Sequence, residues 1–113
     1  MNKKIVKKLI LIITIIISLM IIVTVGSAIK IKNSEAYPFA KEYIINDKEV
    51  HEKTGDILAF GSFPSGLIRE DYRKIKAQIE IDVEGTKWSG KIIVIMERSK
   101  DSIKWKYKKV HYL

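Results

Sequence analysis

Side chains that commonly carry out chemistry are sparse in this chain of 113 residues. Cysteine is absent, which excludes disulfides, thiolate zinc sites, iron–sulfur clusters and a thiol nucleophile. The two histidines, His51 and His111, are far apart, and neither has a second histidine at the spacing of a helical metal site. We therefore expect both histidines on the surface, and we predict no metal site and no cofactor.

Carboxylates are adjacent at Glu70-Asp71 and alternate at Glu80, Asp82 and Glu84. Neighbouring carboxyl groups can share a proton or bind a hard cation, so acid–base catalysis is one interpretation. The alternation is also what the solvent side of an amphipathic strand requires, and we favour that explanation. No nucleophile elbow, phosphate-binding glycine loop or calcium loop accompanies them. We predict that the protein is not an enzyme, and no small-molecule substrate is evident.

One segment concentrates residues that shape the backbone: Phe60-Gly61-Ser62-Phe63-Pro64-Ser65-Gly66. Glycine permits a positive φ or a close approach, and proline restricts φ. We predict a strand from Asp56 to Phe63 and a turn at Pro64-Ser65-Gly66 that ends it. The candidate residues, for partner binding or for a structural turn, are Phe60, Gly61, Phe63, Pro64, Ser65 and Gly66. A structural role is favoured, because prolines and glycines in loops usually mark turns and the ends of helices or strands.

The run from Leu9 to Ile29 carries no charge. As a helix rising about 1.5 Å per residue, it matches the roughly 30 Å of bilayer hydrocarbon. This predicts a basic tail over residues 1–8, a transmembrane helix over 9–29 that contacts the lipid bilayer, and one soluble domain over 34–113. The alternative is a signal peptide cleaved after Ala28, which would release a secreted factor. The apolar run is longer than signal-peptide cores of about 7 to 15 residues, so we favour an anchor.

Lysines flank the apolar run unequally: Lys3, Lys4, Lys7 and Lys8 precede it, and Lys30 and Lys32 follow it. The positive-inside rule then places the N-terminus in the cytoplasm and the C-terminal domain outside it. These lysines also supply most of the formal net charge of +8. The remaining positive and negative charges are nearly balanced and interspersed, which disfavours nucleic acid as a partner.

Periodicity predicts the elements of the domain. Apolar residues at spacings of three and four indicate a helix from Ser34 to Asn46, and Asn46-Asp47 and Gly55 delimit a second helix from Lys48 to Thr54. Strict alternation indicates a strand from Arg73 to Glu84, and a central strand follows from Trp88. We expect an α+β fold: a transmembrane helix, then two short helices packed on a mostly antiparallel sheet of about four strands.

The last strand is predicted from Ile103, with a bulge near Lys108-Lys109 where the apolar register slips. Lysines alternate here with aromatic residues: Trp88, Trp105, Tyr107 and Tyr112. Such a pattern suits a strand that packs one face and keeps the other wet. A platform for nucleic acid or anionic lipid is a minor alternative.

These elements and several short stretches resemble bacterial members of the cytochrome oxidase complex assembly protein family. The stretches are Ser34 to Tyr37, Ala40 to Ile44, Asn46 to Val50, Gly55-Asp56 and Phe60 to Gly66. That family is related in fold to the intermembrane-space domain of a mitochondrial presequence-translocase subunit. The chain departs from the family at Ile68 to Arg73, which is charged where the family has a glycine-rich, weakly polar stretch.

The resemblance implies membrane-tethered help, without catalysis, in assembling a respiratory complex. We therefore expect a single-pass cell-membrane protein whose extracytoplasmic domain is a non-catalytic interaction module, with a membrane protein complex as partner. The alternatives are an extracytoplasmic ligand-binding or envelope-stress sensing domain, or a small envelope enzyme, each of which requires a concave pocket with convergent polar groups.

Overall fold

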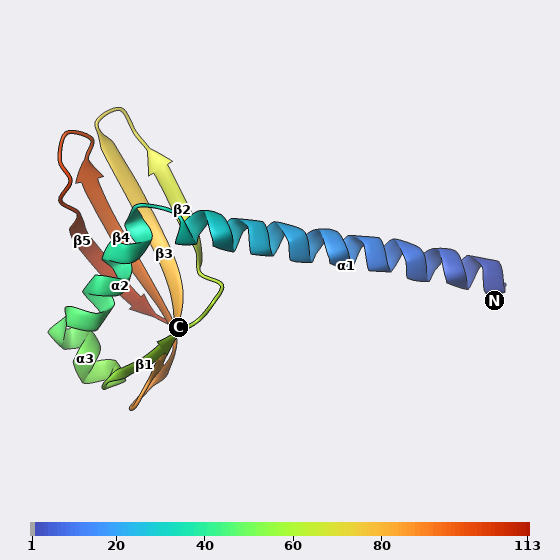
Figure 1. Cartoon of the computed structure of the whole chain (residues 1–113), viewed down its shortest axis with the longest axis horizontal. Coiled ribbons are helices and arrows are strands. Elements are labelled where there is room, and N and C mark those ends of the chain that lie inside the picture. The colour runs from blue at the N-terminus through green and yellow to red at the C-terminus, as the bar shows by residue number, and fades with distance from the viewer. Residues whose placement is uncertain (1) are drawn as a thin grey trace.

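The computed structural model describes residues 2–113 and has an α+β fold, as predicted (Figure 1). A long helix, α1 (Lys3–Lys32), extends from a small domain. The domain contains two short helices, α2 (Ala36–Asn46) and α3 (Lys48–Thr54). Five strands follow: β1 (Ile57–Phe60), β2 (Ser65–Glu70), β3 (Lys74–Gly85), β4 (Ser89–Ser99) and β5 (Lys106–Tyr112).

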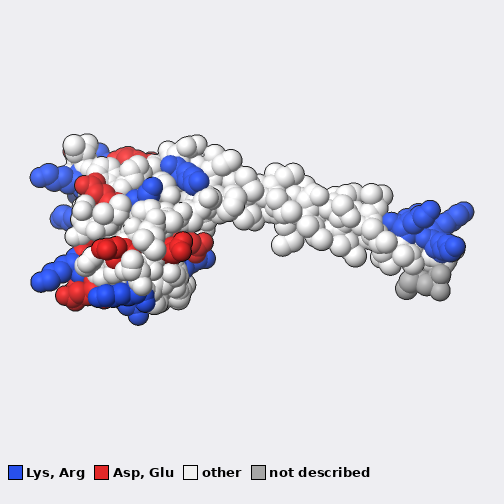
Figure 2. Space-filling view, turned by 60° about the horizontal axis from the view of Figure 1, so that its bottom comes forward, with Lys and Arg blue, Asp and Glu red and all other residues white. Residues whose placement is uncertain are grey.

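Helix α1 is long and apolar enough to span a membrane. Three of its four hydroxyl groups are satisfied within the helix, because Thr14, Ser18 and Thr24 each donate a hydrogen bond to the carbonyl one turn earlier, at 2.8 to 2.9 Å. Its middle is exposed and uncharged, and Figure 2 shows the basic N-terminal tail beyond that stretch. At its C-terminal end, Ala28 and Ile31 are buried against the domain.

The caps of α3 are those that the sequence indicated, whereas the start of α2 differs. The Asp47 carboxylate accepts from the Val50 amide at 3.1 Å to begin α3, and Gly55 ends that helix at a φ of 71°. Helix α2 begins later than predicted, at Ala36. Ser34 does not cap it, because the Ser34 hydroxyl donates to the Ile31 carbonyl at 2.6 Å and so extends the end of α1.

The sheet is antiparallel, and β3 lies between two neighbours. Strand β4 pairs along one edge of β3, while β1 and β2 pair one after the other along its opposite edge. Strand β5 pairs with β4. The edge formed by β1 and β2 is therefore farthest from the edge formed by β5.

Two strand predictions are wrong. The strand predicted from Asp56 to Phe63 ends at Phe60 as β1. Ser65 and Gly66, predicted to lie in a turn, instead begin β2, which runs in the same direction as β1. Strand β3 is long enough to pair with both, and an edge strand tolerates charged side chains such as Arg69. The last strand begins at Lys106, after the predicted start at Ile103, which is 83% exposed.

The predicted bulge near Lys108-Lys109 is confirmed. Ile95 pairs with Lys109 and Met96 pairs with Tyr107, so Lys108 is the extra residue. The bulge returns the apolar residues of β5 to one face of the sheet, where Tyr107 stacks on Tyr43 of α2 with ring centroids 4.2 Å apart.

The core lies between this inner face and the helices. Ile79, Ile81 and Val94 of the sheet are fully buried, as are Ala40 and Ile44 of α2. The Tyr107 hydroxyl donates to the Phe39 carbonyl of α2 at 3.0 Å, which fastens the β5 edge to that helix.

The outer face carries the alternating polar side chains of β3, including Glu80, Asp82 and Glu84. It also carries charge pairs across strands: Glu97 lies 3.2 Å from Lys108 and 3.5 Å from Lys74. A hydrogen bond from Lys108, with the charges of both lysines, lowers the pKa of Glu97 despite partial desolvation.

Substitutions on the two faces of β3 should change the stability by very different amounts. Replacing Ile79→Ala, on the buried face, should lower the free energy of unfolding by about 2–5 kcal/mol, because it leaves a cavity in the core. The neighbouring exposed change Gln78→Ala should alter it by less than about 0.5 kcal/mol. Urea denaturation in detergent, followed by near-ultraviolet circular dichroism, measures both, and equal effects would contradict this core.

Candidate interaction surfaces

The segment from Phe60 to Gly66 forms a bulge in one edge of the sheet. Phe60 pairs with Val83 and Ser65 pairs with Glu80. The residues between Phe60 and Ser65 therefore outnumber their partners on β3, and the surplus protrudes. Figure 1 shows this connection curving away from the sheet on the side where α1 leaves the domain.

The glycines of the bulge have structural roles. The Gly61 amide donates to the Asp82 carbonyl at 2.7 Å, and a Cβ on Gly61 would lie only 2.7 Å from the Asp82 Cβ. Gly66 has a φ of 152°, and a Cβ there would collide with the Gln78 carbonyl oxygen. Both positions need glycine because the chain passes so close to β3.

The neighbouring side chains of the bulge are also held by the domain. Pro64 is fully buried. The Ser65 hydroxyl donates to the Glu80 carboxylate at 2.8 Å. Phe60 is half-buried, with the Lys41 ammonium 4.9 Å from its ring centroid. The structural explanation of the segment therefore accounts for five of its six candidate residues, and the sixth is Phe63.

Phe63 is 62% exposed. It lines a groove with residues of α1, namely Ile17, Met20, Ile21, Thr24 and Val25. These α1 residues belong to the run predicted to cross the membrane, so the bulge brings the domain alongside that part of the helix.

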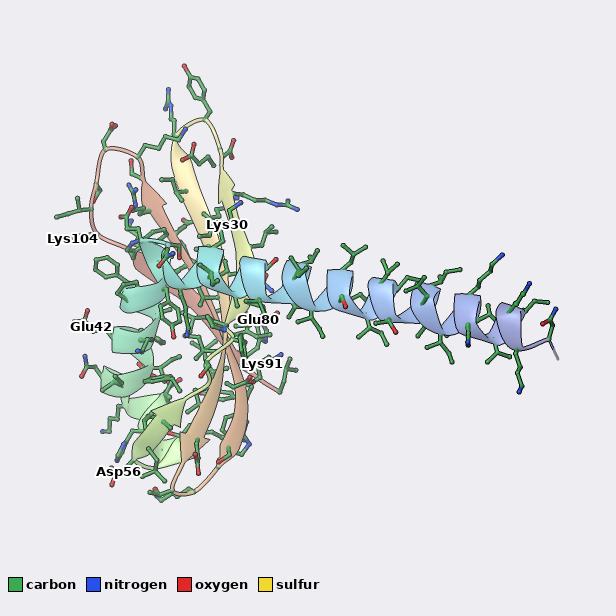
Figure 3. All side chains as sticks on the ribbon, turned by 45° about the vertical axis from the view of Figure 1, so that its right-hand side comes forward. Lys30, Glu42, Asp56, Glu80, Lys91 and Lys104 are labelled. Atoms are coloured by element: carbon green, nitrogen blue, oxygen red, sulfur yellow. The ribbon has the colours of Figure 1, made fainter. Side chains whose placement is uncertain are left out.

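A second groove, the α2 groove, lies between α2 and the residues that lead into β5. It has a volume of about 540 Å³ and is lined by Phe39, Glu42, Tyr43, Asn46, Asp47, Ile103, Lys104, Trp105 and Tyr107. Glu42 and Lys104 lie on the side of the domain away from the rod of α1 (Figure 3). The groove thus combines aromatic walls with a few charged groups.

The tyrosines of the α2 groove stay protonated at neutral pH. Burial raises the pKa of Tyr43, and the nearby Asp47 carboxylate raises it further. Burial also raises the pKa of Tyr107, with a smaller contribution from Glu42. The groove can therefore offer neutral phenol faces, two carboxylates and the Lys104 ammonium to a partner.

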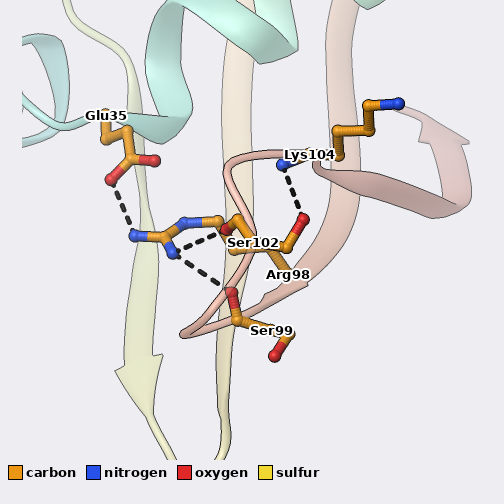
Figure 4. Close-up of polar contacts among 5 residues, drawn as sticks. All are labelled: Glu35, Arg98, Ser99, Ser102 and Lys104. Atoms are coloured by element: carbon orange, nitrogen blue, oxygen red, sulfur yellow. Dashed lines mark hydrogen bonds and ion pairs between the residues drawn. The ribbon is translucent and has the colours of Figure 1, made fainter.

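Arg98 holds the loop that forms one wall of this groove (Figure 4). Its guanidinium pairs with the Glu35 carboxylate at 2.9 Å and donates to the Ser99 and Ser102 carbonyls at 3.2 and 3.1 Å. It also lies over the Trp105 ring, 5.4 Å from the centroid. Because Glu35 directly precedes α2, this cluster joins the connection between α1 and α2 to the loop after β4.

The remaining residues considered in the sequence do not converge. His51 and His111 are exposed, as predicted, and the His51 ring nitrogen lies 4.0 Å from an Asp56 carboxylate oxygen. Glu70 and Asp71 are exposed near the end of β2. Within residues 2–113, no group of three or more histidine, cysteine, aspartate or glutamate side chains is placed to hold a metal ion.

The aromatic residues that alternate with lysines do not form an open platform. Trp105 is 9% exposed and belongs to the core, and Trp88, Tyr107 and Tyr112 pack against it. Packing of one strand face therefore explains the alternation. Sequence reasoning missed the α2 groove because its aromatic side chains were assigned to the core. No local signal marks the groove, because Ile103 alternates with Trp105 in the sequence and only the structure shows that it is exposed.

Comparison with protein-family models, with curated proteins and with solved structures finds no match to this chain.

The bulge predicts a sharp contrast between two of its residues. Gly66→Ala should lower the free energy of unfolding by about 1–3 kcal/mol, because alanine disfavours this φ and its methyl group meets β3. Phe63→Ser should change it by less than about 0.5 kcal/mol, since the ring is largely exposed. Thermal or urea unfolding of the detergent-solubilised chain measures both. A large loss from Phe63→Ser would mean that the ring belongs to the core.

Proposed function

We propose that this protein is a single-pass, non-catalytic interaction module of the cell membrane, with its N-terminus in the cytoplasm and its domain outside. The α2 groove receives a segment of a client membrane protein. The observation that carries the proposal is the composition of this groove, in which aromatic walls adjoin the exposed Ile103. Exposed apolar residues beside aromatic pockets are typical of protein-binding surfaces.

The placement of the groove supports this proposal. It borders α2 and β5, whereas β2, on the opposite edge of the sheet, contacts α1. With α1 in the bilayer, the α2 groove would face away from the lipid and towards the extramembrane part of a neighbouring protein.

The end of α1 supports an uncleaved anchor. Ala28, which precedes the alternative cleavage site, is helical and only 3% exposed. Ile31, just beyond it, belongs to the core cluster. Cleavage after Ala28 would remove a buried side chain from the domain, so the helix and the domain are best suited to remain together.

The nature of the client is proposed from the family resemblance, which rests on short stretches between Ser34 and Asp56 and on the segment from Phe60 to Gly66. On that basis the client is a respiratory complex of the cytochrome oxidase type. The Arg98 cluster fits a non-catalytic module, because it uses its strongest polar contacts to fix the wall of the groove and not to face a substrate.

Crosslinking tests the groove. A photoreactive residue at Asn46, which lines the groove and is exposed, should crosslink to a membrane protein in cells. Ile103→Asp should reduce that crosslink at least tenfold without loss of stability, because Ile103 is 83% exposed. Leu113→Asp is the matched control, since Leu113 is a 73% exposed apolar residue that does not line the groove. Equal crosslinking in all three proteins would refute the groove as the binding surface.

Deletion of the gene tests the client. Oxidase activity per membrane protein should fall and should recover with the wild-type gene but not with the Ile103→Asp variant. Unchanged oxidase activity would remove the respiratory client and leave the crosslinked protein to identify another.

A second candidate is a ligand-binding or sensing domain, because the α2 groove has the size of small-molecule sites, about 300–1,000 Å³. The polar groups Glu42, Asp47 and Lys104 lie around it. This candidate predicts that the photoreactive residue captures no protein. The same crosslinking experiment therefore separates the two.

A further inference from the structure

We propose that Phe63 is a second membrane contact: its ring inserts into the acyl chains of the leaflet on the domain's side, next to α1. This inference rests on the proposed function, because it requires α1 to span the bilayer. It assigns a role to the one residue of the bulge whose exposure the fold does not explain.

The first support is the surroundings of Phe63. One wall of its groove is Ile17, Met20, Ile21, Thr24 and Val25 of α1, a surface without charge. The single hydroxyl in that wall, on Thr24, already donates to the Met20 carbonyl at 2.9 Å. A lipid chain could therefore fill the groove without leaving a polar side chain unpaired.

The second support is depth. Because Ala28 and Ile31 are buried in the domain, the hydrocarbon boundary falls near Val25, before these residues. At about 1.5 Å per residue, the stretch from Ile17 to Val25 covers about 12 Å of the helix axis. Its midpoint, Ile21, lies about 6 Å from Val25 along the axis, within the roughly 5–10 Å to which the apolar faces of interfacial helices are buried.

The third support is continuity along the edge. Two more large exposed apolar residues, Leu67 and Ile68, lie on β2, the strand that contacts α1. Basic residues at the same border, Lys30 and Lys32 at the end of α1 and Arg69 on β2, are exposed and suited to phosphate head groups. Figure 3 shows Lys30 where α1 meets the sheet.

The free edge of β2 limits how deep this contact reaches. Strand β2 pairs with β3 on one side only, so its other backbone groups need water or head groups. The strand must stay at the interface, and only the ring at the tip of the bulge enters the hydrocarbon. The ring would not add a new anchor to α1; it would hold the domain at one orientation, with the α2 groove facing away from the bilayer.

The cysteine-free chain allows site-directed labelling with nitroxide at single introduced cysteines. The full-length protein is placed in phosphatidylcholine vesicles without other proteins. Accessibility is measured to oxygen, which concentrates in lipid, and to a water-soluble nickel chelate. The labelled variants are Phe63→Cys, Met20→Cys as the reference within lipid, and Ile103→Cys as the reference exposed to water.

The label at Phe63→Cys should be accessible to oxygen and protected from nickel, as the label at Met20→Cys is, while the label at Ile103→Cys shows the reverse. A label at Phe63→Cys that behaves like the one at Ile103→Cys, with Met20→Cys still protected, would overturn the inference alone. Nickel access at Met20→Cys would instead overturn the membrane anchor. Protection of Phe63→Cys only when client protein is added would assign the groove to a protein helix and reject lipid.

A second measurement uses a label at another position, so that the Phe63 side chain is retained. A label at Ser62→Cys, on the exposed neighbour of Phe63, should lie near the head groups in the otherwise unchanged chain. Adding Phe63→Ser should raise its nickel accessibility severalfold, because the tip is released. No change would contradict an inserted ring, and the far-ultraviolet circular dichroism of both proteins verifies folding.

Discussion

The burial of the last turns of α1 in the domain is the constraint on which the rest of the structure depends. Ala28 and Ile31 are both buried, and Ile31 belongs to the same core cluster as Ala40 and Val94. Few residues separate α1 from α2, and one of them, Glu35, is held by Arg98. A helix suited to the bilayer is thus joined to the domain by packing as well as by the chain. Any tilt of that helix would carry the sheet with it, so this packing limits the orientations that the domain can take at a membrane.

Because α1 is packed against the domain, the two edges of the sheet have different surroundings. On one edge, β2 lies beside α1 and exposes apolar side chains, whereas the β5 edge carries the α2 groove. An unpaired, apolar edge strand invites association with other chains when it faces water. Placed at a lipid interface, the same edge would be shielded. The exposed apolar residues on β2 and the proposed position of the domain are therefore consistent with each other.

The bulge between β1 and β2 shows how one motif can serve both shape and contact. Gly61 and Gly66 let the chain pass close to β3, and Pro64 is buried, so these residues build the protrusion. Phe63 contributes little to the core and is carried at its tip. The segment that the sequence suggested to be a simple turn is thus a protruding connection that exposes the ring of Phe63. No spacing rule separates the two roles, because the separation depends on where α1 passes.

The sequence by itself determined the elements whose signals are local. The uncharged run of α1, the caps at Asp47 and Gly55, the alternation of β3 and the slip in β5 each reflect contacts within a few residues or across one strand pair. Only the tertiary structure decided the rest. It showed β2 as a strand, because a charged edge segment pairs only when a long partner such as β3 extends beyond β1. It also showed that Tyr43, Trp105 and Tyr107 line a groove while packing against the core, and that Phe63 lines a groove together with α1. These contacts join residues distant in the chain, and no periodicity within one segment records them.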